Sequence, residues 1–358
     1  MIKRKAALVI FVGLITMFVI QVYGFHKGVA IGEKPRDIED VILYDVNGNP
    51  VAPELATGKV LLLFFDPELQ RLIPFYNELW KKYSSMGLRI YAVVGAENAR
   101  RVNSDYIEKY EIDFPVLVDR MNKYGVGNFC LYVMRIGVFP SLFLLEDGVV
   151  KYKMLWANIN EFKVVKKVVE SFVHGLGVPD EYIPCEEGQS AGDWKIGDHT
   201  VGSLLKSHDF LLICLTNRYI RTDNEKVLLA MVKRLKEKFT GRLEAIAVGV
   251  DIGEMFRAWN EYIDTYSKYL DSHGIKVKKM YVGSVPWRIR RSHANFIKKL
   301  NFSFIPMNDL SIYYRFGKPD LPVVILLNKE RKILYMREYH CCDIEQVKEE
   351  ITCIIEEE

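Results

Sequence analysis

One order of secondary-structure signals occurs twice in the chain, and this repeat restricts the fold more than any other feature. In each half a continuous apolar run of strand length, residues 59–65 and 210–216, precedes a segment with helical periodicity, residues 69–83 and 224–239. Further strands and helices alternate, and each half ends with an apolar strand after a proline and an amphipathic helix. This order predicts two α/β domains, each a mixed central sheet flanked by helices.

Prolines and one insertion add detail to the repeat. Pro140 and Pro322 open the matching late strands of the two halves. Pro74 lies inside the first helical segment, where we expect a kink because an internal proline removes a helical hydrogen bond. The second half also contains a long insertion, from about Asp251 to Leu300.

The N-terminal segment has the features of a membrane anchor. Lys3, Arg4 and Lys5 precede an uncharged, mainly apolar stretch, residues 6–25, which as a helix matches a bilayer core of roughly 30 Å. The basic cluster favours a cytoplasmic N-terminus and export of the rest, to the periplasm or the cell surface. A cleaved signal peptide is the alternative, but this stretch exceeds the usual apolar core of about 7–15 residues. We therefore expect an uncleaved transmembrane helix.

The domain boundaries follow from these features. A chain of 358 residues is long enough for an anchor and two domains of ordinary size. A stretch rich in glycine, proline and acidic residues separates the two halves. We expect an anchor at residues 1–25, a linker at 26–40, a first domain at 41–175, a linker at 176–194 and a second domain at 195–358.

Composition excludes some classes of function. The chain is 49% hydrophobic and 27% charged, which is typical of a globular protein. Its net charge of +3 is too small to indicate nucleic acid as a partner. The histidines are scattered and no phosphate-binding glycine loop is present, so the sequence predicts neither a metal site nor a cofactor.

A set of motifs in the first half follows the order of a known protein family. The motifs are Leu43–Val51, Gly58–Phe65, Phe114–Asp119, Tyr124–Val126 and Val138–Gly148. Together they resemble the redoxin group of the thioredoxin-like superfamily, which holds the TlpA/ResA-like thiol-disulfide oxidoreductases and the AhpC/TSA peroxiredoxins. The resemblance covers nearly all of residues 31–175. In the second half it rests on the repeat and on Leu321–Pro322.

The resemblance implies a thioredoxin-like fold for both domains. It also implies that Pro140, and by analogy Pro322, follows a cis peptide bond and faces the active-site loop. A cis bond is otherwise the minority form before proline. The alternative for each is a trans proline that only starts an edge strand.

Both active-site loops lack the Cys-x-x-Cys pair of this family. Counted back from Pro74, the two cysteine positions fall on Asp66 and Leu69. Dithiol exchange needs a thiolate at the helix N-terminus and a resolving thiol beside it. We expect Asp66 or Glu68 to cap the helix, and an acidic pocket edge is the alternative. The residues of the two degenerate loops are Asp66, Pro67, Glu68 and Leu69 in the first half, and Asn217 and Arg218 in the second.

Six cysteines occur elsewhere in the chain. Cys130 and the vicinal pair Cys341–Cys342 are the candidates for displaced redox chemistry. For the vicinal pair we expect separate thiols or other pairings, with a strained vicinal disulfide as the alternative. Cys214 and Cys353 are expected to be buried apolar residues. Cys185, in the interdomain segment, is expected to be exposed and could pair with Cys341 or Cys342.

The insertion contains a basic stretch with no acidic residue. We expect either a docking surface for an acidic partner or for anionic lipid headgroups, or a solvated segment without a partner. The cations are Lys276, Lys278, Lys279, Arg288, Arg290, Arg291, Lys298 and Lys299.

Two hypotheses for function follow. The first is a non-catalytic protein of the cell envelope that binds a protein partner in redox homeostasis or protein maturation, through its cis-proline faces or its basic insertion. The alternative is a thiol-disulfide oxidoreductase or a peroxiredoxin-like antioxidant enzyme that uses Cys130, Cys341 or Cys342 as its reactive thiols.

Overall fold

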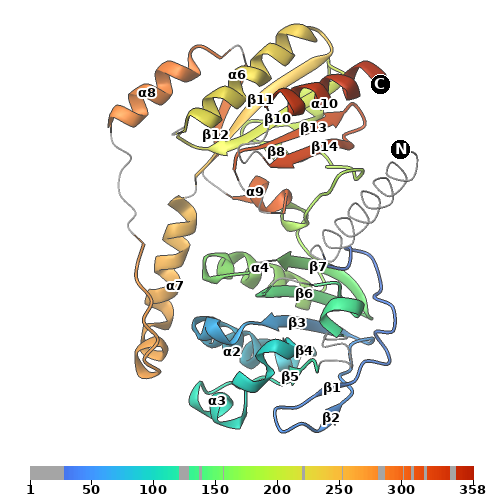
Figure 1. Cartoon of the computed structure of the whole chain (residues 1–358), viewed down its shortest axis with the longest axis vertical. Helices are drawn as coiled ribbons and strands as arrows, with labels where there is room; N and C mark the ends of the chain where they lie inside the picture. Colours follow the sequence, from blue (N-terminus) through green and yellow to red (C-terminus); the bar gives the residue numbers. More distant parts are fainter. Residues whose placement is uncertain are drawn as a thin grey trace, which may run out of the picture. The chain divides into compact units, whose positions relative to one another are not determined.

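The computed structural model divides the chain into two compact units (Figure 1). Residues up to 178 together with 261–278 form the first unit, and residues 179–260 together with 279–358 form the second. The described residues are 28–120, 129–136, 139–155, 157–219, 222–251, 253–280, 287–300, 302–307, 310–317, 321–338 and 344–358.

Some of the sequence predictions concern residues outside these ranges. The predicted anchor at residues 1–25, the motif Tyr124–Val126 and the pair Cys341–Cys342 all lie there. Among the described residues, no helix is both long enough and apolar enough to cross a membrane.

The first unit contains a mixed sheet with the described strand order β2-β1-β5-β4-β3-β6-β7. The central strand β3 is parallel to β4 and antiparallel to β6. The apolar run at residues 59–65 was predicted as a central strand, and β3 confirms this. The strands are β1 (Leu43–Tyr44), β2 (Pro50–Val51), β3 (Lys59–Phe65), β4 (Leu88–Val94), β5 (Val116–Val118), β6 (Ser141–Glu146) and β7 (Val149–Leu155).

The helix after β3 differs from the one predicted at residues 69–83. The chain first forms a 3-10 helix, η1 (Pro67–Leu72), and then the α-helix α2 (Ile73–Tyr83). Pro74 lies in the first turn of α2, so the kink expected inside a helix at this residue is wrong. A proline is tolerated there because the first turn of a helix has no acceptor for its N–H group. The irregular backbone lies earlier, at Leu69.

Short helices complete the first unit. Residues 96–109 form two separate helices, η3 and α3, and the Asn103 side chain caps α3 by accepting a hydrogen bond from the Tyr106 N–H group at 3.0 Å. The helices are η2 (Ser84–Met86), η3 (Ala96–Arg101), α3 (Ser104–Lys109), the π-helical turn η4 (Phe129–Val133), η5 (Ile159–Glu161) and α4 (Phe162–Val173).

The second unit repeats the central part of the first sheet. Its larger sheet has the strand order β12-β11-β10-β13-β14, which matches β5-β4-β3-β6-β7. The directions also match, because β10 is parallel to β11 and antiparallel to β13. The strands are β10 (Phe210–Asn217), β11 (Leu243–Val250), β12 (Ser303–Met307), β13 (Val323–Asn328), β14 (Ile333–Glu338) and, in a separate pair, β8 (Lys195–Ile196) and β9 (His199–Thr200).

Helices surround this second sheet. The helix predicted at residues 224–239 corresponds to α6, and the amphipathic helix expected at the end of the second half corresponds to α10; both contribute to the same apolar cluster. The helices are η6 (Asp180–Tyr182), α5 (Val201–Leu205), α6 (Asp223–Lys238), α7 (Gly253–Ser272), α8 (Trp287–Ile297), α9 (Ser311–Arg315) and α10 (Ile344–Glu357).

The alternation of side chains along β10 explains its unbroken apolar sequence. Phe210, Leu212 and Cys214 belong to one buried cluster, whereas the residues between them belong to another. Successive side chains of a strand point to opposite faces, so both faces of β10 are covered by apolar residues. A strand buried on both faces therefore has an apolar residue at nearly every position.

The segment 261–278 belongs to the first unit, although it lies within the second domain predicted at residues 195–358. It includes the second part of α7. The insertion of the second half therefore contributes residues to the fold of the first.

Candidate functional site

Asp66 occupies the first position of the degenerate loop in the first unit. Its carboxylate accepts a hydrogen bond from the Glu68 N–H group at 2.9 Å and thereby caps η1. The expected capping by Asp66 is confirmed. A carboxylate at this place supplies the negative charge that a helix N-terminus favours. It cannot form or break a disulfide bond, which requires sulfur.

The remaining residues of this loop are held by side chains from neighbouring elements. The Tyr106 hydroxyl donates to the Pro67 carbonyl at 2.9 Å, and Arg101 pairs with Glu68 at 2.9 Å. Arg71, at the end of η1, donates to the Asn158 side-chain oxygen at 3.4 Å. These contacts connect the loop to η3, to α3 and to the residue that caps η5.

Both prolines that open the late strands follow cis peptide bonds. The bonds Phe139–Pro140 and Leu321–Pro322 are cis, the form that the family resemblance implied. The Pro140 carbonyl accepts a hydrogen bond from the Ala157 N–H group at 3.0 Å. Because Asn158 follows Ala157, the Arg71–Asn158 contact links the degenerate loop to the segment bonded to Pro140.

In the second unit, a buried carboxylate organises the loop that follows β10. Glu225 is 1% exposed and lies in the first turn of α6. It forms a reciprocal capping box with Thr222. Its oxygens accept from the Thr216 hydroxyl at 2.8 Å, the Asn217 side-chain amide at 2.9 Å, the Asn217 N–H at 3.2 Å, and the Thr222 N–H and hydroxyl at 3.0 Å each.

Glu225 was not among the predicted site residues. The signal was present, since Thr222 and Glu225 have the Thr-x-x-Glu spacing of a capping box before an apolar helical segment. The contacts to Thr216 and Asn217, in contrast, depend on how β10 and α6 approach each other.

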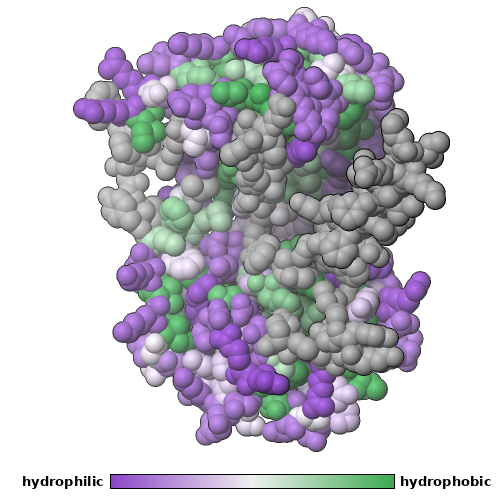
Figure 2. Space-filling model, viewed as in Figure 1, coloured by the Kyte–Doolittle hydropathy of each residue, from purple (hydrophilic) through white to green (hydrophobic). Residues whose placement is uncertain are grey.

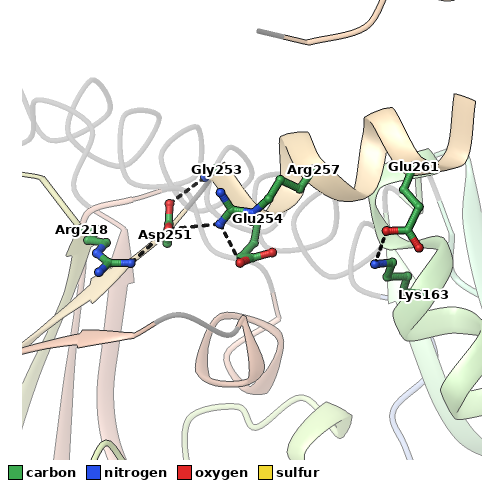
Figure 3. Close-up of polar contacts among 7 residues, drawn as sticks. All are labelled: Lys163, Arg218, Asp251, Gly253, Glu254, Arg257 and Glu261. Atoms are coloured by element: carbon green, nitrogen blue, oxygen red, sulfur yellow. Dashed lines mark hydrogen bonds and ion pairs between the residues drawn. The ribbon is translucent and has the colours of Figure 1, made fainter. Parts of the chain in front are cut away.

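Arg218 is the other residue predicted in this loop. It pairs with Asp251 at 3.2 Å, and Arg257 pairs with the same carboxylate at 3.3 Å. Figure 3 shows Asp251 between the two guanidinium groups, with the Gly253 N–H group donating to it at 3.0 Å. The guanidinium group of Arg218 is therefore paired with a carboxylate of its own unit.

A row of tyrosines from α7 packs on the first unit. The hydroxyl groups of Tyr262, Tyr266 and Tyr269 donate to the Arg71 carbonyl, the Glu78 carboxylate and the Tyr110 carbonyl, respectively. Glu261, just before them, forms an ion pair with Lys163 of α4 (Figure 3). The second part of α7 therefore covers α2, the helix that follows the degenerate loop.

A pocket of about 570 Å³ lies where these tyrosines meet α2. Its charged side chains are paired: Lys81 with Asp113 at 2.9 Å, and Glu78 with Lys166 at 2.7 Å. Burial raises the pKa of Glu78, but hydrogen bonds from Lys166 and Tyr266 outweigh it, so the pKa lies below its usual value. The lining residues are Pro74, Asn77, Glu78, Lys81, Lys82, Glu111, Asp113, Tyr266 and Tyr269.

The burial of the described cysteines agrees with the predictions only in part. Cys130 is 4% exposed within an apolar cluster, and its N–H group donates to Asp119 at 2.8 Å. Cys185 is buried, so its expected exposure is wrong, and burial raises the pKa of its thiol. The expected burial of Cys214 is confirmed, and burial raises the pKa of this thiol as well.

Cys353 was predicted to be buried, and this is wrong because it lies on the exposed face of α10. Burial was expected because Cys353 lies between Ile351 and Ile354 in the sequence. Ile351 packs in the core, whereas Cys353 is turned away from it. A hydrogen bond to Glu357 raises the pKa of the Cys353 thiol.

The eight predicted surface cations are all exposed, but they belong to two units. Lys276 and Lys278 group with the first unit, and the other six group with the second. A single basic surface formed by all eight therefore stays a prediction.

Comparison with known proteins gives matches to between about one third and two fifths of the chain. No protein-family model matches it. The thiol-disulfide oxidoreductase ResA of Geobacillus thermodenitrificans is 30% identical over 132 residues, which are 34% of this chain and 68% of that protein. The ResA protein of Bacillus cereus is 25% identical over 131 residues, 35% of this chain and 72% of that protein. Among solved structures, peroxiredoxin Q of Xanthomonas campestris matches 40% of this chain and 98% of its own, at 17% identity and a TM-score of 0.33.

Proposed function

Because the chain belongs to the redoxin group of the thioredoxin-like superfamily, we propose that it binds a partner protein without exchanging disulfides with it. The observation that carries this proposal is the position of Asp66. Its carboxylate caps the helix at the place where a dithiol redoxin has its attacking thiolate. Leu69 takes the place of the resolving thiol.

The second unit also supports binding without disulfide exchange. Its sheet has the strand order of the first, and its late strand also follows a cis proline. Next to its loop, in the first turn of α6, lies the buried Glu225, and both of its carboxylate oxygens are hydrogen-bonded. This arrangement supports a stabilising role for Glu225 and no exchange chemistry.

The proposed location is the outer side of a membrane. Lys3, Arg4 and Lys5 before the apolar residues 6–25 support an N-terminal anchor with its basic end in the cytoplasm. A partner in redox homeostasis or protein maturation at the cell envelope would meet the protein there. Pro140 and Pro322 are themselves buried, so such a partner would contact the residues around the two cis prolines.

A thiol-disulfide oxidoreductase or a peroxiredoxin-like enzyme is the second candidate. The names of the ResA relatives favour it. It would need a reactive, accessible thiol. Cys130 fits poorly because it is 4% exposed in an apolar cluster, which leaves Cys341 and Cys342 as its better candidates.

The proposal predicts that two cysteines introduced into the loop of the first unit would give the protein disulfide-exchange activity. We expect the double variant Asp66→Cys/Leu69→Cys of the full chain in detergent micelles to catalyse insulin reduction by dithiothreitol. The unaltered protein and the matched Asp66→Ser/Leu69→Ser variant should leave the uncatalysed rate unchanged. The cysteine variant loses the Asp66 cap, at a cost of about 1 kcal/mol, whereas serine can still cap the helix, so thermal unfolding is measured for each. Catalysis by the unaltered protein would contradict the proposal.

A further inference from the structure

We propose that the pocket between α2 and the tyrosines of α7 binds an arginine side chain of the partner protein. This inference rests on the proposed function, because it takes a protein partner as given and names the group of that partner that is recognised. The size and lining of the pocket, one weakly paired carboxylate, and the contacts that hold this carboxylate in place all support it.

The pocket has the size and the wall chemistry of a site for a charged side chain. Its volume of about 570 Å³ lies within the range of about 300–1,000 Å³ that is typical of ligand sites. Tyr266 and Tyr269 of α7 line it together with Glu78 of α2, and all of its lining residues belong to the first unit. Aromatic rings beside carboxylates favour a cationic ligand, because both attract positive charge.

Glu111 is the carboxylate of the pocket with the weakest partner. Its side chain is 73% exposed, and its ion-pair partner among the described residues is the Nε2 atom of His273 at 3.9 Å. This imidazole carries a positive charge only when it is protonated. Glu111 therefore gives the pocket a negative charge that a cationic ligand can neutralise. The closer pairs of the other charged lining residues are Lys81–Asp113, Lys82–Glu170 and Glu78–Lys166.

The tyrosines report the sign of the electrostatic potential in the pocket. Burial raises the pKa of Tyr269, and the negative charges of Glu111 and Asp113 contribute to the same shift. Burial and a hydrogen bond to Glu78 raise the pKa of Tyr266 in the same way. Both hydroxyl groups therefore lie in a negative potential, which attracts a cation.

Buried Asn77 of α2 holds the backbone that presents the carboxylates. Its side-chain amide donates to the Glu111 carbonyl at 2.7 Å, and its side-chain oxygen accepts from the Asp113 N–H group at 3.0 Å. The Tyr269 hydroxyl donates to the carbonyl of Tyr110, the residue before Glu111. This backbone is thus fixed before a ligand arrives, which lowers the entropic cost of binding.

An arginine suits this arrangement better than a lysine or an apolar group. A guanidinium group can donate to two carboxylates at once and can stack on an aromatic ring. Asp113 can turn to such a ligand at little cost, because its pair with the 70% exposed Lys81 is a surface ion pair that contributes little stability. Figure 2 shows mainly hydrophilic residues on the visible surface around α3, just before Glu111, which favours recognition by charge.

Peptide binding to the full chain in dodecyl maltoside micelles tests the proposal. The probe is the peptide acetyl-Gly-Gly-Arg-Gly-Gly-amide, and the control is the same peptide with citrulline, the uncharged isostere of arginine. We expect saturation-transfer NMR to show binding of the arginine peptide, and binding of the citrulline peptide that is about tenfold weaker. High salt should weaken the binding of the arginine peptide, because ions screen the attraction. Equal binding of the two peptides would overturn the proposal.

Charge removal at Glu111 locates the binding in this pocket. We expect Glu111→Gln to bind the arginine peptide about fivefold more weakly, which corresponds to the loss of an exposed ion pair. Glu108→Gln is the matched control and should bind it unchanged, because Glu108 is an exposed residue of α3 outside the pocket lining. Equal losses in both variants would overturn the site. The citrulline comparison needs no variant, so it decides the outcome even where a variant fails to fold.

Ethylguanidinium distinguishes a partner's side chain from a free small cation. We expect the arginine peptide to bind at least as tightly as ethylguanidinium, because the pocket is proposed to admit a side chain that is attached to a backbone. Binding of ethylguanidinium without binding of the peptide would reject the partner's side chain as the ligand.

Insulin reduction, measured on the same samples, separates this inference from the proposed function. Turnover by the unaltered protein would reject the proposed function whatever the peptides show. Absence of turnover together with equal binding of the arginine and citrulline peptides would reject the pocket alone.

Discussion

Replacement of Tyr262 by alanine is expected to destabilise the first unit by about 3–5 kcal/mol, the cost of removing a large buried aromatic side chain. Tyr262 is fully buried, its ring packs edge-on against Phe162 with centres 5.3 Å apart, and its hydroxyl donates to the Arg71 carbonyl. Alanine would leave a cavity beside α4 and would remove the hydroxyl that donates to the Arg71 carbonyl at the end of η1. Both losses fall on the first unit, although residue 262 follows the β10 and β11 strands of the second in sequence.

Hydrogen exchange in increasing denaturant measures this effect for each unit separately. Amides of β3 and β4 report on the first unit, and amides of β10 and β11 report on the second. We expect exchange to accelerate in the first pair of strands only. Tyr262→Phe is the matched control, because it keeps the ring and loses only a hydrogen bond, for about 0.5–1.5 kcal/mol. An unchanged first unit in Tyr262→Ala would contradict the assignment of residues 261–278 to it.

Replacement of Glu225 by alanine should destabilise the second unit by about 3 kcal/mol or more. The buried Thr216 hydroxyl would be left without its acceptor, at a cost of about 1–3 kcal/mol. Loss of the cap that Glu225 forms with Thr222 adds about 1 kcal/mol, and the partly buried Asn217 loses an acceptor as well. Thr216 is fully buried, so water cannot replace the lost acceptor at that hydroxyl.

The same exchange experiment checks this prediction, now with acceleration expected in β10 and β11. Glu225→Gln keeps one acceptor oxygen and the side-chain volume, so its effect should be clearly smaller. Asp223→Ala, a change of an exposed residue in the same helical turn, should have little effect. Equal destabilisation by Asp223→Ala and Glu225→Ala would contradict this prediction, because it would show that Glu225 contributes only its negative charge near the N-terminus of α6.

The central strands and the degenerate loops could be predicted from sequence because their signals are local. The apolar runs that form β3 and β10 need no partner to be recognised, since strands buried on both faces have apolar residues throughout. The capping by Asp66 was also predicted, because a carboxylate just before a helix can accept a hydrogen bond from the free N–H groups of the first turn. In each case the relevant contacts lie within a few residues of sequence.

The parts that could not be predicted depend on distant residues. The hydroxyl of Tyr262 donates to the carbonyl of Arg71 across 191 positions of sequence. Nothing in the local pattern of α7 indicates which unit its tyrosines contact. The periodicity of residues 69–83 predicts one continuous helix with Pro74 inside it, whereas the η1 turn shifts the start of α2 to Ile73.

The central claim is that a redoxin fold remains while its dithiol chemistry is absent, and thiol counting on the full chain tests it most directly. The protein is treated with mild reductant or dilute peroxide and then unfolded, alkylated and measured by intact mass. With six cysteines present, we predict the same number of alkylated thiols after both treatments. A loss of two thiols after peroxide that reductant restores would identify a cycling pair and contradict the claim.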